Sequence, residues 1–156
     1  MVRELRSEDR EQVLELVRAT KNFSEPEIAI AKELIDIFVE QPDQKDYYAH
    51  VIEADDRIAG FLLLGPTPAT IGTYDMYWIA VHPNFQGRGI AQELDHFAVE
   101  FVRQRNGYWL IAETSSGLNY DRTRAFYMKQ GYNLLAQIPD YYKPGDDLMV
   151  FGKRLE

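Results

Sequence analysis

Apolar positions near the start of the chain follow the spacing of a short strand and two amphipathic helices. Residues 2–5 predict the strand, and Ser7 is expected to cap the first helix. Ser24 stands three residues before Glu27, the spacing of a capping box, which predicts the start of the second helix. The apolar stripes of the two helices are formed by Val13, Leu14 and Val17 and by Ala31, Leu34, Ile35 and Phe38.

Three segments with the apolar character of strands follow, and turn signals separate them. Residues 47–54, 58–64 and 73–81 predict strands, with a turn at Asp55 and a second break at Gly65. Consecutive strands joined by turns pair antiparallel. This part of the chain is therefore expected to form a meander.

The second half of the chain alternates between helical and extended patterns. The expected elements are a helix that starts at Ile90, a strand at residues 108–112, a short helix that Gly131 ends, and strands at residues 132–138 and 148–155. The strand at residues 108–112 is almost wholly apolar, as in strands covered on both faces. The complete order predicts a single α/β (α+β) domain over residues 1–156, with a mixed central sheet of about seven strands flanked by four helices.

Composition and charge exclude several classes of protein. The chain has 156 residues, 46% of them hydrophobic, which suffices for one globular domain. It lacks cysteine, so disulfides and thiolate chemistry are excluded, and its net charge of −8 disfavours a nucleic-acid surface. No apolar run is long enough to span a membrane or to form a secretory signal. We therefore expect a cytoplasmic protein with neither nucleic acid nor a membrane as its partner.

A glycine-rich segment before the predicted long helix carries the clearest chemical signal. Residues 86–91 read Gln-Gly-Arg-Gly-Ile-Ala. Glycines let a ligand approach the backbone closely, and the unpaired N–H groups and positive dipole end of a helix start attract an anion such as a pyrophosphate. Arg88 can add a charge-assisted contact. The alternative is a turn that only connects the strand to the helix.

Two other phosphate-binding loops fit this segment less well. A nucleoside triphosphate loop ends in Gly-Lys followed by Ser or Thr, and that ending is absent. A Rossmann fingerprint would use Gly87 and Gly89 as its first two glycines, but Gln92 takes the place of the third. The next predicted strand leads to an acidic residue, Glu113, as in dinucleotide-binding proteins, so an NAD-binding Rossmann-type protein stays an alternative.

Two blocks of sequence resemble the GNAT superfamily of N-acetyltransferases. The strand at residues 77–81, followed by residues 86–91, is similar to the acetyl-coenzyme A (acetyl-CoA) signature of that family. The residues that match its pattern, Gln/Arg-x-x-Gly-x-Gly/Ala, are Gln86, Gly89 and Ala91. Residues 123–132 resemble the second motif of the family, a helix with a tyrosine followed by Gly-Tyr. The resemblance implies the GNAT fold and transfer of the acetyl group of acetyl-CoA to a primary amine.

The resemblance also implies how the carrier binds. The pantetheine arm would pair with strand backbone as an added strand does, and the pyrophosphate would lie on amides at the helix start. The implied residues are Ile79, Val81, Gln86, Gly87, Arg88, Gly89, Ile90 and Ala91. Arg122, Arg124 and Lys129 either approach the adenosine phosphates or are solvated helix charges. Tyr120 stands where the family often has an asparagine that contacts the coenzyme.

Direct attack of an amine on the thioester needs a base for the amine proton and an acid for the leaving thiolate. By its place in the second motif Tyr127 is the candidate acid, with a packed helix aromatic as the alternative. Glu113 is the candidate base, because it ends an apolar strand that would raise the pKa of its carboxyl; a solvated strand-end charge is the alternative. Asp75 is the second candidate base, expected on the same face as Ile79 and Val81, or else a surface charge.

The acceptor is specified by weaker signals. In the family the first two helices and the last hairpin line the acceptor side, so aromatic and acidic hairpin side chains could attract a cation, unless they only form an ordinary turn. These residues are Tyr141, Tyr142, Asp146 and Asp147. The expected acceptor is a small-molecule or peptide amine, with no metal ion involved, and the enzyme is expected to be a monomer or homodimer. The non-enzymatic alternative is an acyl-CoA binding or sensing module without turnover.

Overall fold

The computed structural model describes residues 1–156. Its strands are β1 (Val2–Glu4), β2 (Tyr48–Ala54), β3 (Arg57–Pro66), β4 (Thr73–Val81), β5 (Trp109–Ser115), β6 (Asn133–Lys143) and β7 (Asp146–Arg154). Its α-helices are α1 (Arg10–Ala19), α2 (Glu25–Glu40), α3 (Ile90–Arg103) and α4 (Asp121–Lys129), and its short 3-10 helices are η1 (Ser7–Asp9), η2 (Pro83–Phe85) and η3 (Leu118–Tyr120). None of these helices has the length and apolar character needed to cross a membrane.

The seven strands form one sheet in the order β1-β2-β3-β4-β5-β7-β6. Strands β1 to β4 are antiparallel neighbours, β4 and β5 are parallel, and β5, β7 and β6 are again antiparallel. The predicted mixed sheet of seven strands with four helices is thereby confirmed. The Rossmann-type alternative is wrong, because that fold requires a series of parallel strands, whereas the glycine-rich segment here follows an antiparallel meander.

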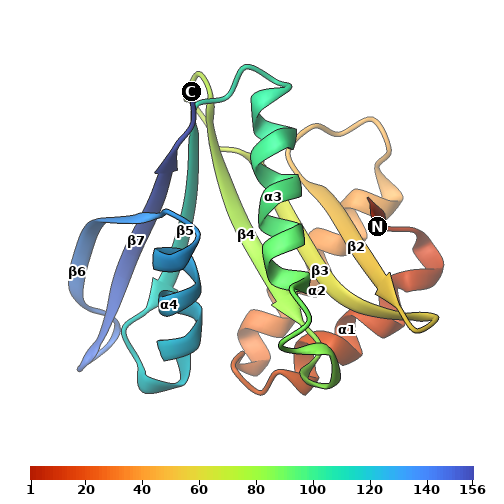
Figure 1. Cartoon of the computed structure of the whole chain (residues 1–156), viewed down its shortest axis with the longest axis horizontal. Coiled ribbons are helices and arrows are strands. Elements are labelled where there is room, and N and C mark those ends of the chain that lie inside the picture. Colours follow the sequence, from red (N-terminus) through yellow and green to blue (C-terminus); the bar gives the residue numbers. More distant parts are fainter.

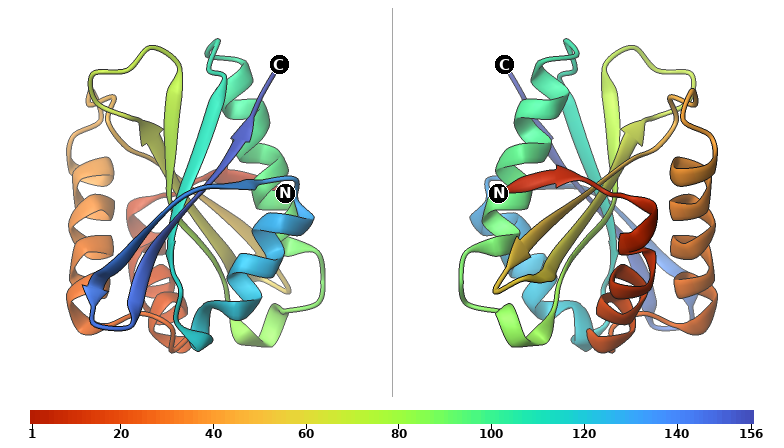
Figure 2. Two further views of the ribbon diagram at one scale, coloured as in Figure 1. Left: turned by 90° about the vertical axis from the view of Figure 1, so that its left-hand side faces the viewer. Right: turned by 90° about the vertical axis from the view of Figure 1, so that its right-hand side faces the viewer.

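Helices cover both faces of the sheet, so the molecule has three layers (Figure 2). α1 and α2 lie on one face, and α3 and α4 lie on the other. Each face has its own apolar core, with 18 buried residues on the α3/α4 side and 15 on the α1/α2 side. Side chains alternate between the two faces along β3, so this strand contributes to both cores. Leu62 and Leu64 lie in the α3/α4 core, and Phe61 and Leu63 lie in the α1/α2 core.

Local sequence signals predicted one helix start correctly and another incorrectly. The capping box of α2 is present: Ser24 Oγ accepts from the Glu27 N–H at 3.3 Å, and Glu27 Oε1 accepts from the Ser24 N–H at 3.0 Å. The expected cap at Ser7 is wrong. The carboxylate of Asp9 instead accepts the N–H of Arg6 at 2.8 Å, and η1 precedes α1.

Two strands run further than the apolar pattern predicted. β5 continues past Ala112 to Ser115, and β6 continues past Ile138 to Lys143. Both pair with β7, and this pairing carries them beyond the point where their apolar pattern stops. Glu113 therefore lies within a strand rather than at its end.

β4 and β5 are paired over only three residue pairs, the last of which is Asp75 with Ile111. Beyond that pair the two strands diverge, as their lower ends in Figure 1 show. We call the region between the diverging strands the split. Helices α3 and α4 both begin at its open end (Figure 1).

A β-bulge in β4 changes which side chains face each core beside the split. The register between β3 and β4 shifts so that Tyr77 has no partner in β3. Met76, Ile79 and Val81 consequently all pack toward the α3/α4 core, whereas Trp78 belongs to the α1/α2 core. On a regular strand, residues 76 and 79 would point to opposite faces.

Candidate active site

The edge that β4 presents to the split carries backbone donors without a partner in the sheet. The His82 N–H donates to the carbonyl of Ala59 on β3 at 2.8 Å, so alternation turns the N–H of Ala80 toward β3 as well. The N–H groups of Ile79 and Val81 therefore point into the split, where β5 no longer pairs with β4. An extended ligand with amide groups can pair with this edge as an added strand does.

The glycine-rich segment lies between β4 and α3, at the open end of the split. Gly87 and Gly89 have φ angles of 78° and 77°, in the left-handed region that favours glycine. A Cβ at either position would meet no protein atom within 4 Å. The N–H groups of Ile90 and Ala91 precede the first hydrogen bond of the helix, which Glu93 donates to the carbonyl of Gly89. Open space and unpaired donors together make this helix start suitable for an anion.

The side chains of Gln86 and Arg88 already have partners within the protein. Gln86 Oε1 accepts from the guanidinium of Arg122 on α4 at 3.3 Å, which connects the segment to α4 across the split. Arg88 pairs with Asp55, in the turn between β2 and β3, at 2.8 Å and lies over the ring of Phe85. Exposed pairs of this kind are weak, so a phosphate can compete with Asp55 for the guanidinium.

Arg124 is one of the three cations that could approach adenosine phosphates, but its guanidinium already has partners within the protein. Its guanidinium donates to the carbonyls of Ser115 and Gly117, each at 2.8 Å, and pairs with the carboxylate of Asp121. These contacts hold the start of α4 beside the end of β5. Arg122 and Lys129 are exposed.

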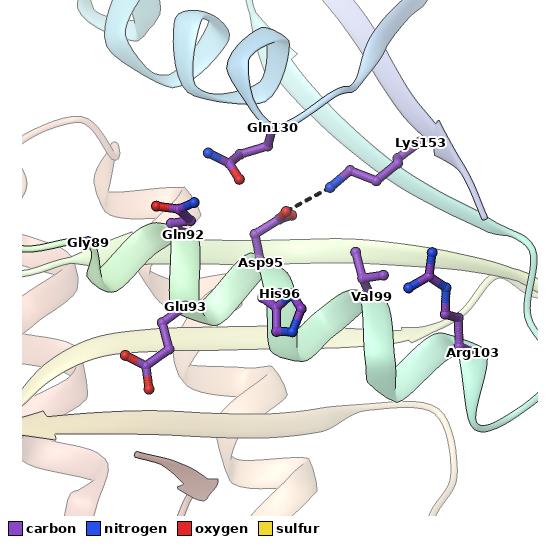
Figure 3. Close-up of a pocket in the computed structure, with 9 residues that line it drawn as sticks. All are labelled: Gly89, Gln92, Glu93, Asp95, His96, Val99, Arg103, Gln130 and Lys153. Atoms are coloured by element: carbon purple, nitrogen blue, oxygen red, sulfur yellow. Dashed lines mark hydrogen bonds and ion pairs between the residues drawn. The ribbon is translucent and has the colours of Figure 1, made fainter. Parts of the chain in front are cut away.

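A buried charge network joins α3 to β7 on the α3/α4 face, beside the paired stretch of β4 and β5. Asp95 is only 2% exposed, and its carboxylate accepts from Lys153 Nζ at 2.8 Å and from the Tyr132 hydroxyl at 2.6 Å. Figure 3 shows Asp95 pointing from α3 toward Lys153, beside a groove of about 440 Å³. Since the two halves of the sheet share only three paired positions, this network is a second connection between them.

Tyr127, the candidate acid, is buried on the α3/α4 side of β5. Its ring centroid lies 5.2 Å from that of Tyr132 and 5.7 Å from that of Phe151. Burial raises the pKa of the Tyr127 hydroxyl above its ordinary value, and the negative charge of Asp95 raises it further. The hydroxyl therefore keeps its proton at neutral pH. The contacts are those of a packed aromatic, and the role of proton donor stays a prediction.

Glu113, the candidate base, lies on the opposite face of β5 from Tyr127. Ala112 packs into the α3/α4 core, so alternation directs the Glu113 side chain to the α1/α2 face. The side chain reaches solvent, yet partial burial raises the pKa of its carboxyl, and the charge of Asp75 adds to this effect. A carboxyl with a raised pKa is better matched to proton abstraction near neutral pH.

The expectation that Asp75 shares a face with Ile79 and Val81 is wrong. The bulge at Tyr77 interrupts the alternation, so Asp75 lies on the α1/α2 face while Ile79 and Val81 pack toward α3 and α4. Asp75 accepts a hydrogen bond from the Thr67 hydroxyl at 2.8 Å. Burial first, and then the charge of Asp75, raises the pKa of Tyr77 to about 12.

Tyr142 and Asp146, two of the four hairpin residues expected to face an acceptor, lie with other acidic groups. Burial raises the pKa of Tyr142 to about 12, and the charges of Glu113, Glu27 and Asp146 contribute to the same shift. The Asp146 carboxylate accepts a hydrogen bond from the Ser115 hydroxyl at the end of β5. Side chains from α2, β5, β6 and β7 therefore meet on the α1/α2 face.

Of the other two hairpin residues, Asp147 takes no part in this cluster, and Tyr141 contacts it through Tyr142. The carboxylate of Asp147 accepts from the N–H of Asp140 at 2.9 Å and from the side-chain amide of Gln137 at 2.8 Å, so it stabilises the hairpin itself. Tyr141 is 55% exposed and packs edge-on against Tyr142. Asp147 is therefore better described by the alternative interpretation, in which it only stabilises an ordinary turn.

Asp95 and Glu27 are the residues that the sequence analysis missed. Asp95 stands in the apolar stripe of α3, one turn before Val99, and a carboxylate in a buried stripe is a signal that could have found it. Glu27 was assigned only to the capping box. Its charge also adds to burial in raising the pKa of Tyr120, in the segment that follows β5.

A helix start suited to an anion beside an open strand edge, with titratable side chains on both faces, is the arrangement expected of a group-transfer enzyme with a phosphorylated carrier. The sequence family described as acetyltransferase (GNAT) domain matches residues 45–134. That match covers more than half of the chain. The chain belongs to the GNAT family of acetyltransferases, as the resemblance predicted.

Solved structures agree with this assignment. A GNAT-family acetyltransferase from Desulfovibrio desulfuricans is 35% identical, with a TM-score of 0.96 over 100% of this chain and 99% of that chain. An aminoglycoside 6'-N-acetyltransferase complexed with coenzyme A has the same fold at 16% identity, with a TM-score of 0.77 over 99% and 96% of the two chains. Ard1 from Thermoplasma volcanium has a TM-score of 0.79 at 18% identity, over 100% and 97%. Comparison with curated protein sequences gave no match.

Proposed function

We propose that this acetyltransferase moves the acetyl group of acetyl-CoA to a primary amine, on a small molecule or a peptide, by direct attack on the thioester. The single observation that carries the proposal is the edge of β4. The N–H groups of Ile79 and Val81 are unpaired there, beside a helix start with two left-handed glycines. A carrier with both an amide-rich arm and a pyrophosphate matches these two features at once.

The carrier is proposed to lie on the α3/α4 side of the split. Its pyrophosphate accepts hydrogen bonds from the N–H groups of residues 87–91. Arg88 leaves Asp55 and binds a phosphate oxygen instead, and Gln86 holds the segment against α4. Its pantetheine amides pair with Ile79 and Val81. The solved neighbour that contains coenzyme A supports a carrier of this kind.

The reaction forms a bond between the amine nitrogen and the acetyl carbon and breaks the bond between that carbon and sulfur. An N–H of the β4 edge donates to the oxyanion that develops on the thioester oxygen. Glu113 takes the proton that the amine loses, with Asp75 as the second candidate, and Tyr127 gives a proton to the leaving thiolate. The two proton transfers occur on opposite faces of β5, in agreement with the positions of these side chains.

The charge on the α1/α2 face supports an amine as the acceptor. The charges of Glu27, Glu113 and Asp146 all act on Tyr142, and none of the ion pairs of the protein involves any of them. An alkyl amine is almost entirely protonated at neutral pH, so an uncompensated negative site favours its approach. The ring of Tyr142 adds an aromatic surface for the same cation.

The test is amine-dependent release of coenzyme A. Purified protein is incubated with acetyl-CoA and a panel of primary amines, free thiol is measured, and the acetylated product is identified by mass. We expect thiol release that depends on both substrates. If acetyl-CoA raises the melting temperature but no amine releases thiol, the chain is a binding module instead. Turnover with alcohols alone would contradict the assignment of an amine acceptor.

A further inference from the structure

Thr114, near the end of β5, has a buried hydroxyl without a hydrogen-bond partner. The residue is 5% exposed, and its Oγ1 neither donates to nor accepts from any other atom of the protein. The other buried side-chain atom without a partner is Nδ1 of His50 on β2, a strand that β3 and β4 separate from the split. Because a buried polar group without a partner destabilises a protein, the Thr114 hydroxyl indicates a role beyond packing.

Thr114 lies beside the split. The last residue pair of β4 and β5 is Asp75 with Ile111, and the two strands diverge beyond it (Figure 1). Thr114 comes three residues after Ile111. Counting onward from the last pair, and leaving out the bulge residue Tyr77, places Thr114 opposite Ile79. The residue therefore stands across the split from an unpaired N–H of β4.

The side chain of Thr114 points to the α3/α4 face. Ala112, two positions earlier on β5, packs into the α3/α4 core, so alternation puts Thr114 on the same face. Its partner on β7, Met149, packs against the same core. The ring of Tyr127 packs on Phe151, the β7 partner of Ala112, so this ring lies one step along the face from Thr114. The hydroxyl thus shares a face with the proposed acid and the proposed carrier.

The proposed reaction brings the thioester to this level of β5. The amine approaches from the face of Glu113, which directly precedes Thr114, and the thiolate leaves on the face of Tyr127. The acetyl carbon therefore passes between the two faces beside Thr114, and negative charge develops on its oxygen. A fixed donor that is shielded from bulk water stabilises such charge without reorganising in the transition state.

We propose that the Thr114 hydroxyl donates a hydrogen bond to the carbonyl oxygen of the thioester and is, together with an N–H of the β4 edge, the second donor to the oxyanion. This inference rests on the proposed function. The N–H reaches the oxygen from one wall of the split and the hydroxyl reaches it from the other. The hydroxyl gains its partner when the acylated carrier binds, which explains why it has none within the protein.

The test replaces Thr114 with valine, which has the same shape but lacks the hydroxyl. We expect kcat for amine-dependent release of coenzyme A to fall at least about tenfold, because one oxyanion donor is lost. Binding of coenzyme A itself, which has no acetyl oxygen, should stay within about twofold of wild type by calorimetry. The melting temperature of the unliganded variant should rise by at least about 2 °C, because an unpartnered hydroxyl has been removed.

Two further variants separate the hydroxyl from other effects of the substitution. Thr114→Ser keeps the hydroxyl and should restore most of kcat. Thr73→Val is the matched control, because Thr73 pairs with Trp109 at the closed end of the split and its loss should leave kcat unchanged. In Thr114→Val the acidic midpoint of kcat should also stay where it is in wild type, since the hydroxyl and the carboxyl of Glu113 lie on opposite faces of β5.

The outcomes that contradict this role differ from those that contradict the proposed function. Unchanged kcat in Thr114→Val, or an equal loss of kcat in Thr114→Ser, would overturn Thr114 as a donor and leave the proposed function intact. A lower melting temperature in Thr114→Val would also overturn it, because the hydroxyl would then have a partner in the unliganded protein. Absence of turnover with every amine in wild type would overturn both.

Discussion

On the α3/α4 face, the split is lined by neutral backbone donors and a helix start, and the buried ring of Tyr127 packs on the same face. On the α1/α2 face, the polar groups include the carboxylates of Asp75, Glu27, Glu113 and Asp146. The first set attracts an anion and the second repels one, while an ammonium group has the opposite preference. The comparison teaches that charge differs between the two faces of the sheet, which supports the proposal that each substrate approaches from its own face and that the two meet where β4 and β5 separate.

The largest effect is expected from removing the proposed acid. Tyr127→Phe deletes one oxygen and keeps the ring that packs on Tyr132 and Phe151. We predict a loss of about 10²- to 10⁴-fold in kcat, the usual contribution of general acid–base catalysis. Binding of acetyl-CoA, measured by calorimetry, should stay within about twofold of wild type, because the hydroxyl acts only on the departing sulfur. An unchanged kcat would remove Tyr127 from the mechanism.

The candidate base on the other face should give the next largest effect, together with a change in pH dependence. Glu113 must be deprotonated to accept a proton, and its pKa is raised. The kcat of wild type should therefore increase as pH rises through this pKa and then level off. Glu113→Gln should lower the plateau about 10²-fold and abolish this acidic limb, because the amide does not titrate. Asp75→Asn is the matched comparison.

If the acidic limb persists in Glu113→Gln and disappears in Asp75→Asn, the roles of the two carboxylates are reversed. The dependence of kcat on pH above neutrality offers a further check. Burial raises the pKa of Tyr127 above that of an ordinary tyrosine, so the acid keeps its proton well beyond neutral pH. No alkaline loss of kcat from Tyr127 should be seen below about pH 10, the ordinary value for tyrosine.

The two faces could be predicted from sequence to different extents. The glycine-rich loop, the strand beside it and the capping box of α2 are local patterns of neighbouring residues, and they were found where expected. The face of Asp75 was mistaken because the bulge at Tyr77 depends on the register between β3 and β4, which a single strand does not reveal. On the α3/α4 side, Asp95 was missed because its partner, Lys153, lies 58 positions further along the chain.

The α1/α2 face also depends on long-range contacts. Tyr142 faces Glu113 because β6 extends beyond its predicted end, and pairing with β7 causes that extension. The hydrogen bond between Tyr120 and Asn22 likewise joins segments that no periodicity connects. The proposed binding loop for the carrier can thus be predicted from a short motif, whereas the proposed acceptor site, assembled from four elements, cannot.

A smaller effect on carrier affinity is expected at the glycine-rich segment. Gly89→Ala places a Cβ in space that no protein atom occupies but that the pyrophosphate would need. We predict at least about tenfold weaker binding of acetyl-CoA, equivalent to losing one hydrogen bond to a charged group. Gly131→Ala is the matched control, because Gly131 also has a left-handed φ, of 91°, and open space for a Cβ.

Both glycine variants should lose similar stability, about 1–2 kcal/mol, from backbone strain alone. Thermal unfolding measures this shared loss, and calorimetry measures the affinity. Equal weakening of acetyl-CoA binding in the two variants would show that strain, rather than contact with the carrier, explains the result at Gly89.

The smallest effect is expected from the exposed pair of Arg88 and Asp55. Arg88→Gln should weaken acetyl-CoA binding by at most about fivefold, and the difference should shrink as salt is added, because exposed charges are screened. Asp55→Asn should instead strengthen acetyl-CoA binding, since it frees the Arg88 guanidinium for the phosphates. Tighter binding in Arg88→Gln would contradict a contact between this guanidinium and the carrier.

The account depends most on the claim that the carrier pairs with the free edge of β4 on the α3/α4 face. Backbone amide chemical shifts of isotope-labelled protein, followed while acetyl-CoA is added, test this residue by residue. The largest changes should fall on Ile79, Val81 and residues 87–91, with smaller changes at Ala80, whose N–H is directed to β3. Changes confined to Glu27, Tyr142 and Asp146, with the β4 edge unaffected, would contradict the assignment of the two faces.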